Sequence, residues 1–328
     1  MTAVSSTALR ARRARSARTL EAVQSYGVTG VLLLIAVVAA LVFPSFGVPE
    51  NLLSITTAAC FVGLITIGQG FVLISGGIDL SVGSMVGLGS VLAALAAPHG
   101  PVAALLVPLS AGALVGLVNG LLIGKVRLAA FIVTLSSMLA VNGIAIVLAP
   151  STILLDSTSA FARIGTGSFL GVNNLIWILV FAFAIAGIVL NRTPFGSRVF
   201  ALGGNEDAAR MMGINVGRVK ISVYVISGAL AGLAGALLAA RLASGNATLG
   251  AGYELTSIAS AVIGGILLTG GVGTMFGALC GVLLVGTIQN IINQIGTLNA
   301  HYQGLMTGLF LVVAVIIQGF LSNRRVQS

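Results

Sequence analysis

An acidic side chain in an apolar setting is the first feature of this sequence that could do chemistry. Asp79 lies in the segment SGGIDLS between two long apolar runs and has no polar loop around it. Ionisable side chains within apolar segments are costly and usually functional. A structural role competes, because the preceding Gly76 and Gly77 can bend the chain and let the carboxylate cap a helix that begins near Leu80. We expect capping to come first, and it is compatible with a role in a path for a solute.

Neutral amides are the other polar side chains inside apolar runs. They donate and accept hydrogen bonds without a buried charge. Asn290 and Asn293 are three residues apart, near the outer end of their run, and could line the mouth of a path. For any single amide, a hydrogen bond between two helices is the better explanation. The candidates for a translocation path or its gating are Asp79, Gln69, Asn119, Asn142, Asn290 and Asn293.

Patterns for catalysis or metal binding are not found in the sequence. The two cysteines, Cys60 and Cys280, lie in apolar runs, where a thiol behaves as a small hydrophobic group. A phosphate-binding loop is excluded, because Asn119 stands where the first glycine before Gly124-Lys125 should be. We therefore predict a non-enzymatic chain without cofactor or metal. If the chain moves a solute, the energy for that movement must come from a partner subunit or from an ion gradient.

Membrane helices are the elements that must position these side chains. Of the 328 residues, 57% are hydrophobic and 7% are charged, whereas soluble domains carry about 25% charged residues. A membrane-spanning helix takes about 20 apolar residues. Ten apolar runs occur, at 28–43, 52–75, 82–97, 101–124, 128–149, 173–191, 219–240, 255–270, 274–294 and 303–320. We predict an all-α polytopic membrane protein with about ten transmembrane helices, the first an uncleaved span rather than a signal peptide.

The distribution of positive charge predicts the orientation of these helices. With the amino terminus in the cytoplasm, 14 of the 16 Lys and Arg residues lie inside, and only Arg163 and Arg241 lie outside. Because Lys and Arg favour cytoplasmic loops, both termini are expected inside. The expected domains are a basic tail (1–27) against the membrane lipid, a transmembrane domain (28–321) with a cytoplasmic loop (192–220), and a second tail (322–328).

The cytoplasmic loop carries the signals of a short helix over residues 206–212. Asn205 is a good N-cap, and Gly213 is placed to end the helix about two turns later. Glu206 and Asp207 suit the positive first turn. A helix this short is marginal in water, so it needs a surface to pack on. Its apolar members are Ala208, Met211 and Met212. We expect it to dock on a partner rather than on its own membrane domain.

Glycines at four-residue spacing form ridges inside the apolar runs. The ridges are Gly112, Gly116, Gly120 and Gly124, then Gly228 and Gly232, then Gly277 and Gly281. In lipid, close approach of backbones at small residues supplies much of the packing between helices. We expect these glycines to serve helix packing rather than a ligand.

Three segments resemble one known family, and the likeness covers nearly the whole chain. SGGIDLSVGSMVGL (75–88), RTPFGSRVFALGGNEDAARMMGINVGRVK (192–220) and SIASAVIGGILLTGGVGTMFGALCGVLLVGTIQNIIN (257–293) are similar to permease subunits of bacterial ABC-type importers of the ribose, xylose and galactoside class. The closing run GTLNAHYQGLMTGLFLVVAVIIQ is most similar to a galactofuranose-type permease, which works beside a second, non-identical permease.

The resemblance implies a membrane subunit, in the bacterial inner membrane, that carries a monosaccharide delivered by an external binding protein. Its expected partners are an ABC ATPase subunit, which hydrolyses ATP, and a second permease subunit, identical or homologous. The loop helix would be the element that docks on the ATPase, through Asn205, Glu206, Asp207, Ala208, Arg210 and Gly213. No nucleic-acid partner is expected despite the net charge of +9, because the positive charge follows the membrane topology.

Three other functions compete with this interpretation. An ion-coupled secondary transporter usually employs ionisable residues at the membrane midplane, and six of the seven acids here are expected in the tail, loops or edges. A membrane enzyme would need a catalytic dyad or a metal-ligand spacing. An ABC permease for another small polar solute, such as an amino acid, is opposed by the GGIDLS segment through its resemblance to the sugar branch.

Overall fold

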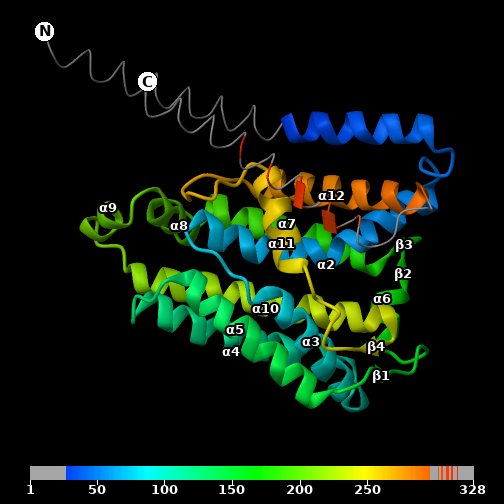
Figure 1. The fold of residues 1–328 in the computed structure, drawn as a ribbon, viewed down its shortest axis with the longest axis horizontal. Coiled ribbons are helices and arrows are strands. Elements are labelled where there is room, and N and C mark those ends of the chain that lie inside the picture. Colours follow the sequence, from blue (N-terminus) through cyan, green and yellow to red (C-terminus); the bar gives the residue numbers. More distant parts are fainter. Residues whose placement is uncertain are drawn as a thin grey trace, which may run out of the picture.

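The computed structural model describes residues 27–295 and, within the last apolar run, Tyr302, Gly304, Leu305, Gly308, Leu309, Val312 and Ile316. The helices lie side by side in one bundle (Figure 1). Seven described helices are long and apolar enough to cross a membrane: α2 (Pro49–Ile74), α3 (Val82–Ala96) with the 3₁₀ turn η1 (Ala97–His99), α4 (Pro101–Gly124), α5 (Ala130–Leu148), α7 (Asn174–Arg192), α10 (Val216–Leu242) and α12 (Met275–Ile295). Two apolar helices are shorter, Gly27–Val42 and α11 (Tyr253–Ile263). The all-α polytopic class is confirmed, whereas most of the two predicted tails lies outside the described residues.

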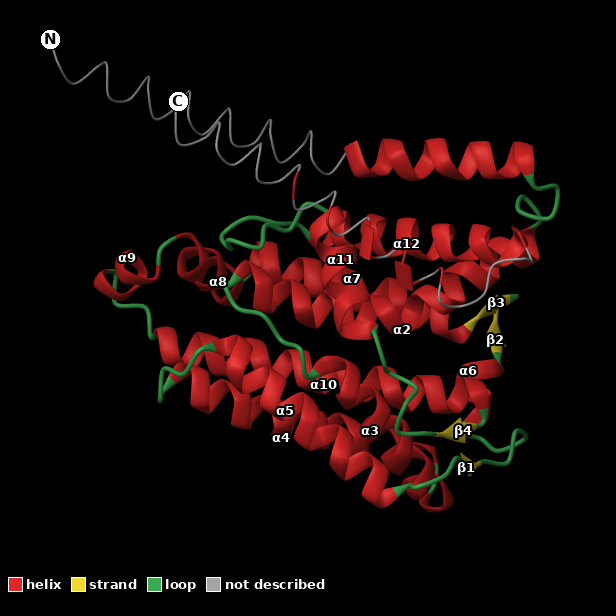
Figure 2. Cartoon of the chain, in the orientation of Figure 1, coloured by secondary structure: helices red, strands yellow, loops and turns green. Residues whose placement is uncertain are grey.

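Short elements mark the two ends of the bundle. α8 (Pro194–Gly204) and α9 (Glu206–Met211) lie together at the left of Figure 1. The opposite end holds α6 (Ala162–Thr166) and two antiparallel strand pairs, as Figure 2 shows. The pairs are β1 (Ile153–Leu154) with β4 (Ser244–Gly245), and β2 (Ser168–Phe169) with β3 (Val172–Asn173). We name these the α9 end and the strand end.

Local sequence signals explain where many helices begin. Proline occupies the first turn of α2, α4 and α8, where its missing N–H costs no hydrogen bond. Side chains cap α7, α8, α9 and α10 by accepting a hydrogen bond from a first-turn backbone N–H, and they are Asn173, Thr193, Asn205 and Asn215. Most of these caps belong to the polar segment at the α9 end.

A seam of glycines joins α4 to α10. A methyl group on Gly112 would lie 2.0 Å from the carbonyl oxygen of Gly228, and one on Gly120 would lie 2.7 Å from the Cα of Ile221. No side chain larger than hydrogen fits at these positions. Gly277 and Gly281 of the third ridge approach the backbone of α11 equally closely, at Gly264 and Ser260. The prediction that these glycines serve helix packing is confirmed.

The apolar run 255–270 is not one continuous helix, and its prediction as a regular span is wrong. α11 ends at Ile263, and residues 264–274 form turns and irregular chain. Gly265, Gly270 and Gly271 have positive φ of 90°, 85° and 74°, which breaks the helix. The backbone N–H of Gly271 donates to the carbonyl oxygen of Ile74 at 2.8 Å, so a contact with the end of α2 holds the break in place. Hydropathy alone cannot reveal such a break.

Two irregular segments enter the bundle from opposite ends and lead into helices. Residues 75–81 follow α2 at the α9 end and lead into α3, and residues 246–252 come from the strand end and lead into α11. The second segment runs along α3, where a methyl group on Gly87 would lie 2.1 Å from the carbonyl oxygen of Ala247. Irregular backbone is tolerated at membrane depth where protein buries it. The two irregular segments therefore enter the bundle from opposite ends, and the second packs on the helix that the first begins.

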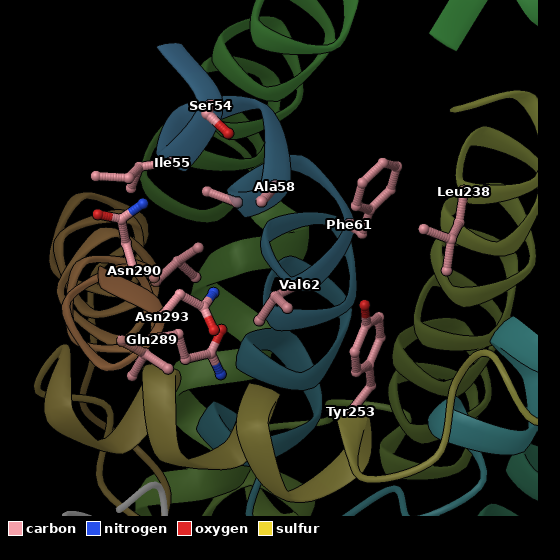
Figure 3. Close-up of a pocket in the computed structure, with 14 residues that line it drawn as sticks. Ser54, Ile55, Ala58, Phe61, Val62, Leu238, Tyr253, Gln289, Asn290 and Asn293 are labelled. Atoms are coloured by element: carbon pink, nitrogen blue, oxygen red, sulfur yellow. The ribbon is translucent and has the colours of Figure 1, made fainter. Parts of the chain in front are cut away.

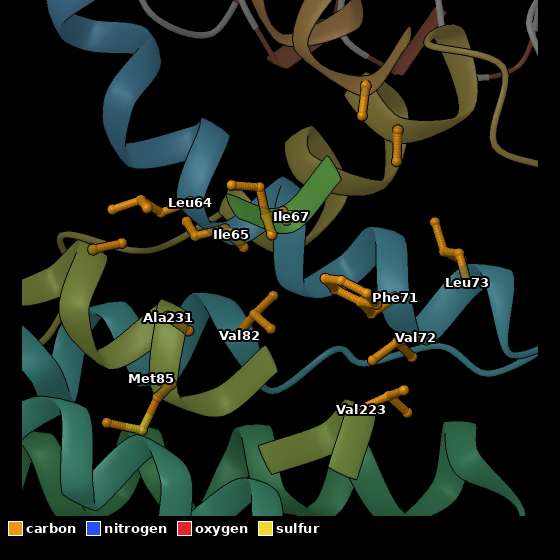
Figure 4. Packing of buried hydrophobic residues seen from close by; sticks show 14 of the residues in the cluster. Leu64, Ile65, Ile67, Phe71, Val72, Leu73, Val82, Met85, Val223 and Ala231 are labelled. Carbon is orange, nitrogen blue, oxygen red and sulfur yellow. The ribbon is translucent and has the colours of Figure 1, made fainter. Parts of the chain in front are cut away.

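Apolar side chains fill the bundle and also cover its outside. Leu64, Val72, Val82 and Met85 belong to the buried core between α2, α3 and α10 (Figure 4). Large apolar side chains on the outer faces of α4, α5 and α7 are more than half exposed, among them Leu114, Ile132 and Phe181. Lipid is the solvent that such faces require. The chain is thus a multi-pass membrane protein.

Candidate functional site

Asp79 lies at the centre of a buried polar cluster. Its side chain is fully buried. Its Oδ1 accepts hydrogen bonds from the backbone N–H of Ser81 at 3.0 Å and the Ser81 hydroxyl at 2.6 Å, and its Oδ2 accepts one from the Ser227 hydroxyl of α10 at 2.8 Å. Among the described residues the carboxylate has no cationic partner. The carboxylate therefore ties the irregular segment 75–81 to α10.

The expected capping of a helix near Leu80 is not what the structure shows. α3 begins at Val82, its N-cap is Ser81, and no side chain caps it. The Asp79 carboxylate closes a turn before the helix instead, because it accepts from Ser81 rather than from a first-turn N–H of α3. The chain stays irregular for longer than predicted, since the second carboxylate oxygen is bound by Ser227 on another helix.

Asn119 extends the same cluster to two further helices. Its Nδ2 donates to the Ser81 hydroxyl at 3.1 Å, and its Oδ1 accepts a short hydrogen bond from the Ser137 hydroxyl of α5. Tyr224 of α10 donates its hydroxyl to the carbonyl oxygen of Ile78 at 3.1 Å. The structure thus joins Asp79 and Asn119, which the sequence presented as separate candidates. The serines were missed, because a serine within an apolar run gives no signal of its partner.

An open pocket lies between α2, α10, α11 and α12 in the strand-end half of the bundle (Figure 3). Its volume is about 270 Å³, near the lower limit of about 300 Å³ for small-ligand pockets. Gln289, Asn290 and Asn293 of α12 line it on the side that faces α2. Tyr253, the first residue of α11, lines it as well. None of the lining residues is charged, so the pocket offers amide and hydroxyl groups to a neutral solute.

Asn290 also joins two helices. Its Nδ2 donates to Oδ1 of Asn51 at 2.8 Å, and its Oδ1 accepts from Nδ2 of Asn51 at 3.2 Å and from Nε2 of Gln294 at 2.8 Å. Asn51 lies in the first turn of α2, so these bonds fasten α12 to α2 at the strand end. Hydrogen bonding between helices and lining of the pocket are therefore both found for Asn290.

The remaining two candidates lie apart from the pocket lining and from the Asp79 cluster. Gln69 is fully buried on α2, and neither of its amide atoms has a hydrogen-bond partner among the described residues. Asn142 is exposed on α5. The predicted path residues thus divide between a closed cluster, an open pocket and two separate places.

The predicted loop helix is present as α9, which ends one residue earlier than expected. Asn205 caps it by accepting from the backbone N–H of Ala208 at 2.9 Å. Gly213 follows with φ of 79°, the left-handed conformation expected after a helix. Met211 and Met212 are 84% and 67% exposed. α9 therefore presents two large apolar side chains to the surroundings at the α9 end.

Glu206 connects α9 to α10. Its carboxylate accepts hydrogen bonds from Lys220 at 2.8 Å and, over a short distance, from Arg210. The hydrogen bond from Lys220 is the main cause that lowers the pKa of Glu206, so the carboxylate is ionised at neutral pH. Lys220 lies in the second turn of α10, the helix that carries Tyr224 and Ser227. The sequence predicted the cap and the acidic first turn but not this ion pair.

A bundle of apolar helices with an uncharged, amide-lined pocket is typical of a membrane transport protein. Residues 51–315 match the family described as branched-chain amino acid transport system / permease component, and the chain belongs to that family. No solved structure matches significantly.

Several curated relatives are similar over nearly their whole length. A ribose import permease protein from Bacillus subtilis is 40% identical, with 87% of this chain and 90% of the relative covered. An L-arabinose ABC transporter permease protein from Azospirillum brasilense is 37% identical, with 91% and 88% covered. An inner membrane ABC transporter permease protein from Escherichia coli, YjfF, is 38% identical, with 84% and 86% covered. The chain therefore resembles whole permease subunits rather than parts of larger proteins.

Proposed function

We propose that this chain is the membrane-spanning permease subunit of an ATP-binding-cassette importer and that it carries a monosaccharide delivered by an external binding protein. The observation that carries the proposal is the 40% identity to a ribose import permease over nearly the whole chain. The pocket supports it, because uncharged amide groups match a solute whose polar groups are hydroxyls. We place the subunit in the bacterial inner membrane and assign it no enzymatic activity.

The charge at the two ends of the bundle supports a cytoplasmic α9 end. Its cations are Lys125, Arg127, Arg192, Arg198, Arg210, Arg218 and Lys220, and the strand end has only Arg163 and Arg241 among the described residues. We propose that α9 faces the cytoplasm, that the pocket opens to the outside, and that the chain has ten spans with both termini inside. One of these spans is the broken helix that includes α11, and the last is the run 303–320. The domain boundaries proposed from the sequence, 1–27, 28–321 and 322–328, follow from this topology.

In this proposal, α9 docks on an ATPase subunit, and ATP hydrolysis by that subunit supplies the energy for transport. The exposed Met211 and Met212 provide an apolar surface. Glu206 transmits movement to α10 through Lys220, and α10 contacts the segment 75–81 through Tyr224. A displaced α9 would thus act on the irregular segment that begins α3. The external binding protein would dock at the strand end, and a second permease subunit would complete the importer.

The rival transporters lack comparable support. An ion-coupled transporter needs an acid that exchanges its ion, and the Asp79 carboxylate is enclosed by three hydrogen bonds from serines. Import of an amino acid is favoured by the family description. Such a solute carries a carboxylate and an ammonium group, and no charged residue lines the pocket to receive them.

Sugar-dependent ATP hydrolysis tests the proposed function. The chain is purified with its co-expressed ATPase and second permease, reconstituted into lipid nanodiscs, and supplied with its binding protein. Ribose, arabinose, xylose and galactose are compared with leucine as solute. We expect at least one monosaccharide, and not leucine, to stimulate hydrolysis several-fold. Stimulation by leucine alone, or by no solute of the panel, would contradict the proposal.

A further inference from the structure

Gln69 is a buried amide whose hydrogen-bonding groups are not used within the protein. Its side chain is fully buried in α2, and neither Oε1 nor Nε2 has a partner among the described residues. Buried polar groups in proteins are nearly always paired, because an unpaired one has lost its bonds to water without replacement. An amide kept in this state points to a partner that is bound only at some stage of function.

The position of Gln69 on α2 relates it to the open pocket. Residues four, seven and eleven apart share one face of a helix. Ala58 and Val62 line the pocket, and Gln69 follows them by eleven and seven residues. At about 1.5 Å per residue, Gln69 lies about 10 Å deeper than Val62 on the same side of α2. The face of α2 that lines the pocket therefore continues to this amide.

The neighbours of Gln69 in α2 show what surrounds it. A methyl group on Gly68 would lie 2.7 Å from the Cα of Ser227 in α10, so this side of α2 is closed by backbone. A methyl group on Gly70 would contact the side chains of Ile266 in the α11–α12 connection and of Met275 at the start of α12. Gln69 stands between Gly68 and Gly70 in the helix, so its side chain projects between the direction of α10 and that of the α11–α12 connection.

α11 borders the pocket and is flanked by glycines at both ends. Tyr253 lines the pocket at the start of α11, and glycines with positive φ stand on both sides of the helix, at Gly252 and Gly265. α11 packs backbone against backbone on α12, where a methyl group on Gly281 would lie 2.0 Å from the carbonyl oxygen of Ser260. α11 and the adjoining half of α12 therefore form one closely packed unit.

We propose that Gln69 forms a second, occluded binding position for a neutral polyhydroxylated solute, which is reached from the open pocket when α11 moves away from α2. The amide oxygen accepts a hydrogen bond from one hydroxyl of the solute, and the amide NH₂ donates to another. Adjacent hydroxyls of a monosaccharide match this pair of groups. The inference rests on the proposed function and adds to it the inner contact of the sugar.

Uptake by reconstituted complexes tests the role of Gln69. Gln69→Leu removes both hydrogen-bonding groups at nearly constant volume. Thr66→Val is the matched control, because Thr66 is also buried in α2 but donates its hydroxyl to Val62 of its own helix. Radiolabelled ribose, arabinose, xylose and galactose are the probes. Gln69→Leu is expected to reduce uptake at least tenfold while its thermal unfolding midpoint stays equal or rises. Thr66→Val should keep wild-type uptake, and Gln69→Asn should keep part of it with a raised KM.

Each result of this experiment supports or rejects the inference. Wild-type uptake by Gln69→Leu overturns it. Loss of uptake together with a lower unfolding midpoint also overturns it, since the amide would then support the fold. If the wild-type complex takes up none of the four sugars, the proposed function itself fails, and that outcome is distinguished by the unmodified complex alone.

Discussion

At the scale of single residues, Asp79 shows how a buried acid can be stabilised without a cation. Three donors from Ser81 and Ser227 surround its carboxylate, and Ser81 is in turn held by Asn119. The cluster joins the segment 75–81 to α4 and α10. Because this segment leads into α3, the cluster fixes the position of the start of α3. Charge as such is not required for these contacts, because hydrogen-bond acceptors suffice.

Replacement of Asp79 shows whether the cluster requires a negative charge or only a hydrogen-bond acceptor. Asp79→Asn keeps an acceptor for Ser81, and its NH₂ group can donate to the Ser227 hydroxyl, so we expect a mild loss of transport. Asp79→Ala leaves three buried donors without an acceptor and should cost about 1–3 kcal/mol of stability. Uptake and thermal unfolding, both corrected for the amount of protein in the membrane, measure the difference. Equal and severe loss in the two variants would show that the negative charge is essential.

At the scale of elements, the ion pair between Glu206 and Lys220 links α9 to α10. The hydrogen bond from Lys220 lowers the pKa of Glu206, so the carboxylate gains stability when it is ionised. This contribution is complete above the ordinary pKa of a glutamate and is lost as the pH falls through the lowered value. Around neutral pH the connection between the two helices is therefore insensitive to pH.

A charge swap tests whether this connection transmits energy. Glu206→Lys places a cation at the positive start of α9 and beside Lys220, so we expect sugar-stimulated ATP hydrolysis to fall several-fold while the amount of protein in the membrane is unchanged. The double variant Glu206→Lys, Lys220→Glu restores an opposite-charge pair and should recover part of the activity. If the single variant keeps wild-type stimulation, α9 is not the coupling element. If the double variant gains nothing, the effect lies in α9 alone.

The elements also show which features the sequence could predict. α9 was predictable because its cap Asn205 and the terminating Gly213 are local signals. The break after α11 was not, because it depends on a hydrogen bond from Gly271 to Ile74, nearly two hundred residues away.

The spacing of Asn290 and Asn293 predicted that they line the mouth of a path, and both line the pocket. For the same reason as the break, the polar cluster that joins Asp79 to Asn119 could not be predicted. Their partners come from separate helices.

At the scale of the whole molecule, the asymmetry of charge between the two ends decides the orientation in the membrane. Met211 is exposed at the α9 end, and Ser157 is exposed at the strand end. The native cysteines Cys60 and Cys280 are buried and give a low background. Single cysteines at the two exposed positions can therefore report the side on which each end lies.

Labelling of intact cells with a membrane-impermeant maleimide measures this orientation. Ser157→Cys should react from outside, and Met211→Cys should react only after the membrane is opened. Co-expression of the ATPase subunit is expected to protect Met211→Cys several-fold, with Ser157→Cys as the unaffected control. Reversed labelling would reject the proposed topology together with the coupling role of α9.

The glycine seam between α4 and α10 has a consequence for biogenesis. α4 is complete at Gly124, but its partner α10 begins only at Val216, after the five helices α5 to α9 have been made. At about 5–20 residues per second, translation of the intervening chain takes on the order of ten seconds. During that interval the glycine row of α4 has no helix packed on it, and lipid chains pack poorly against it. The nascent chain therefore passes through a stage at which membrane chaperones and proteases can distinguish it from the finished subunit, and the arrival of α10 ends that stage.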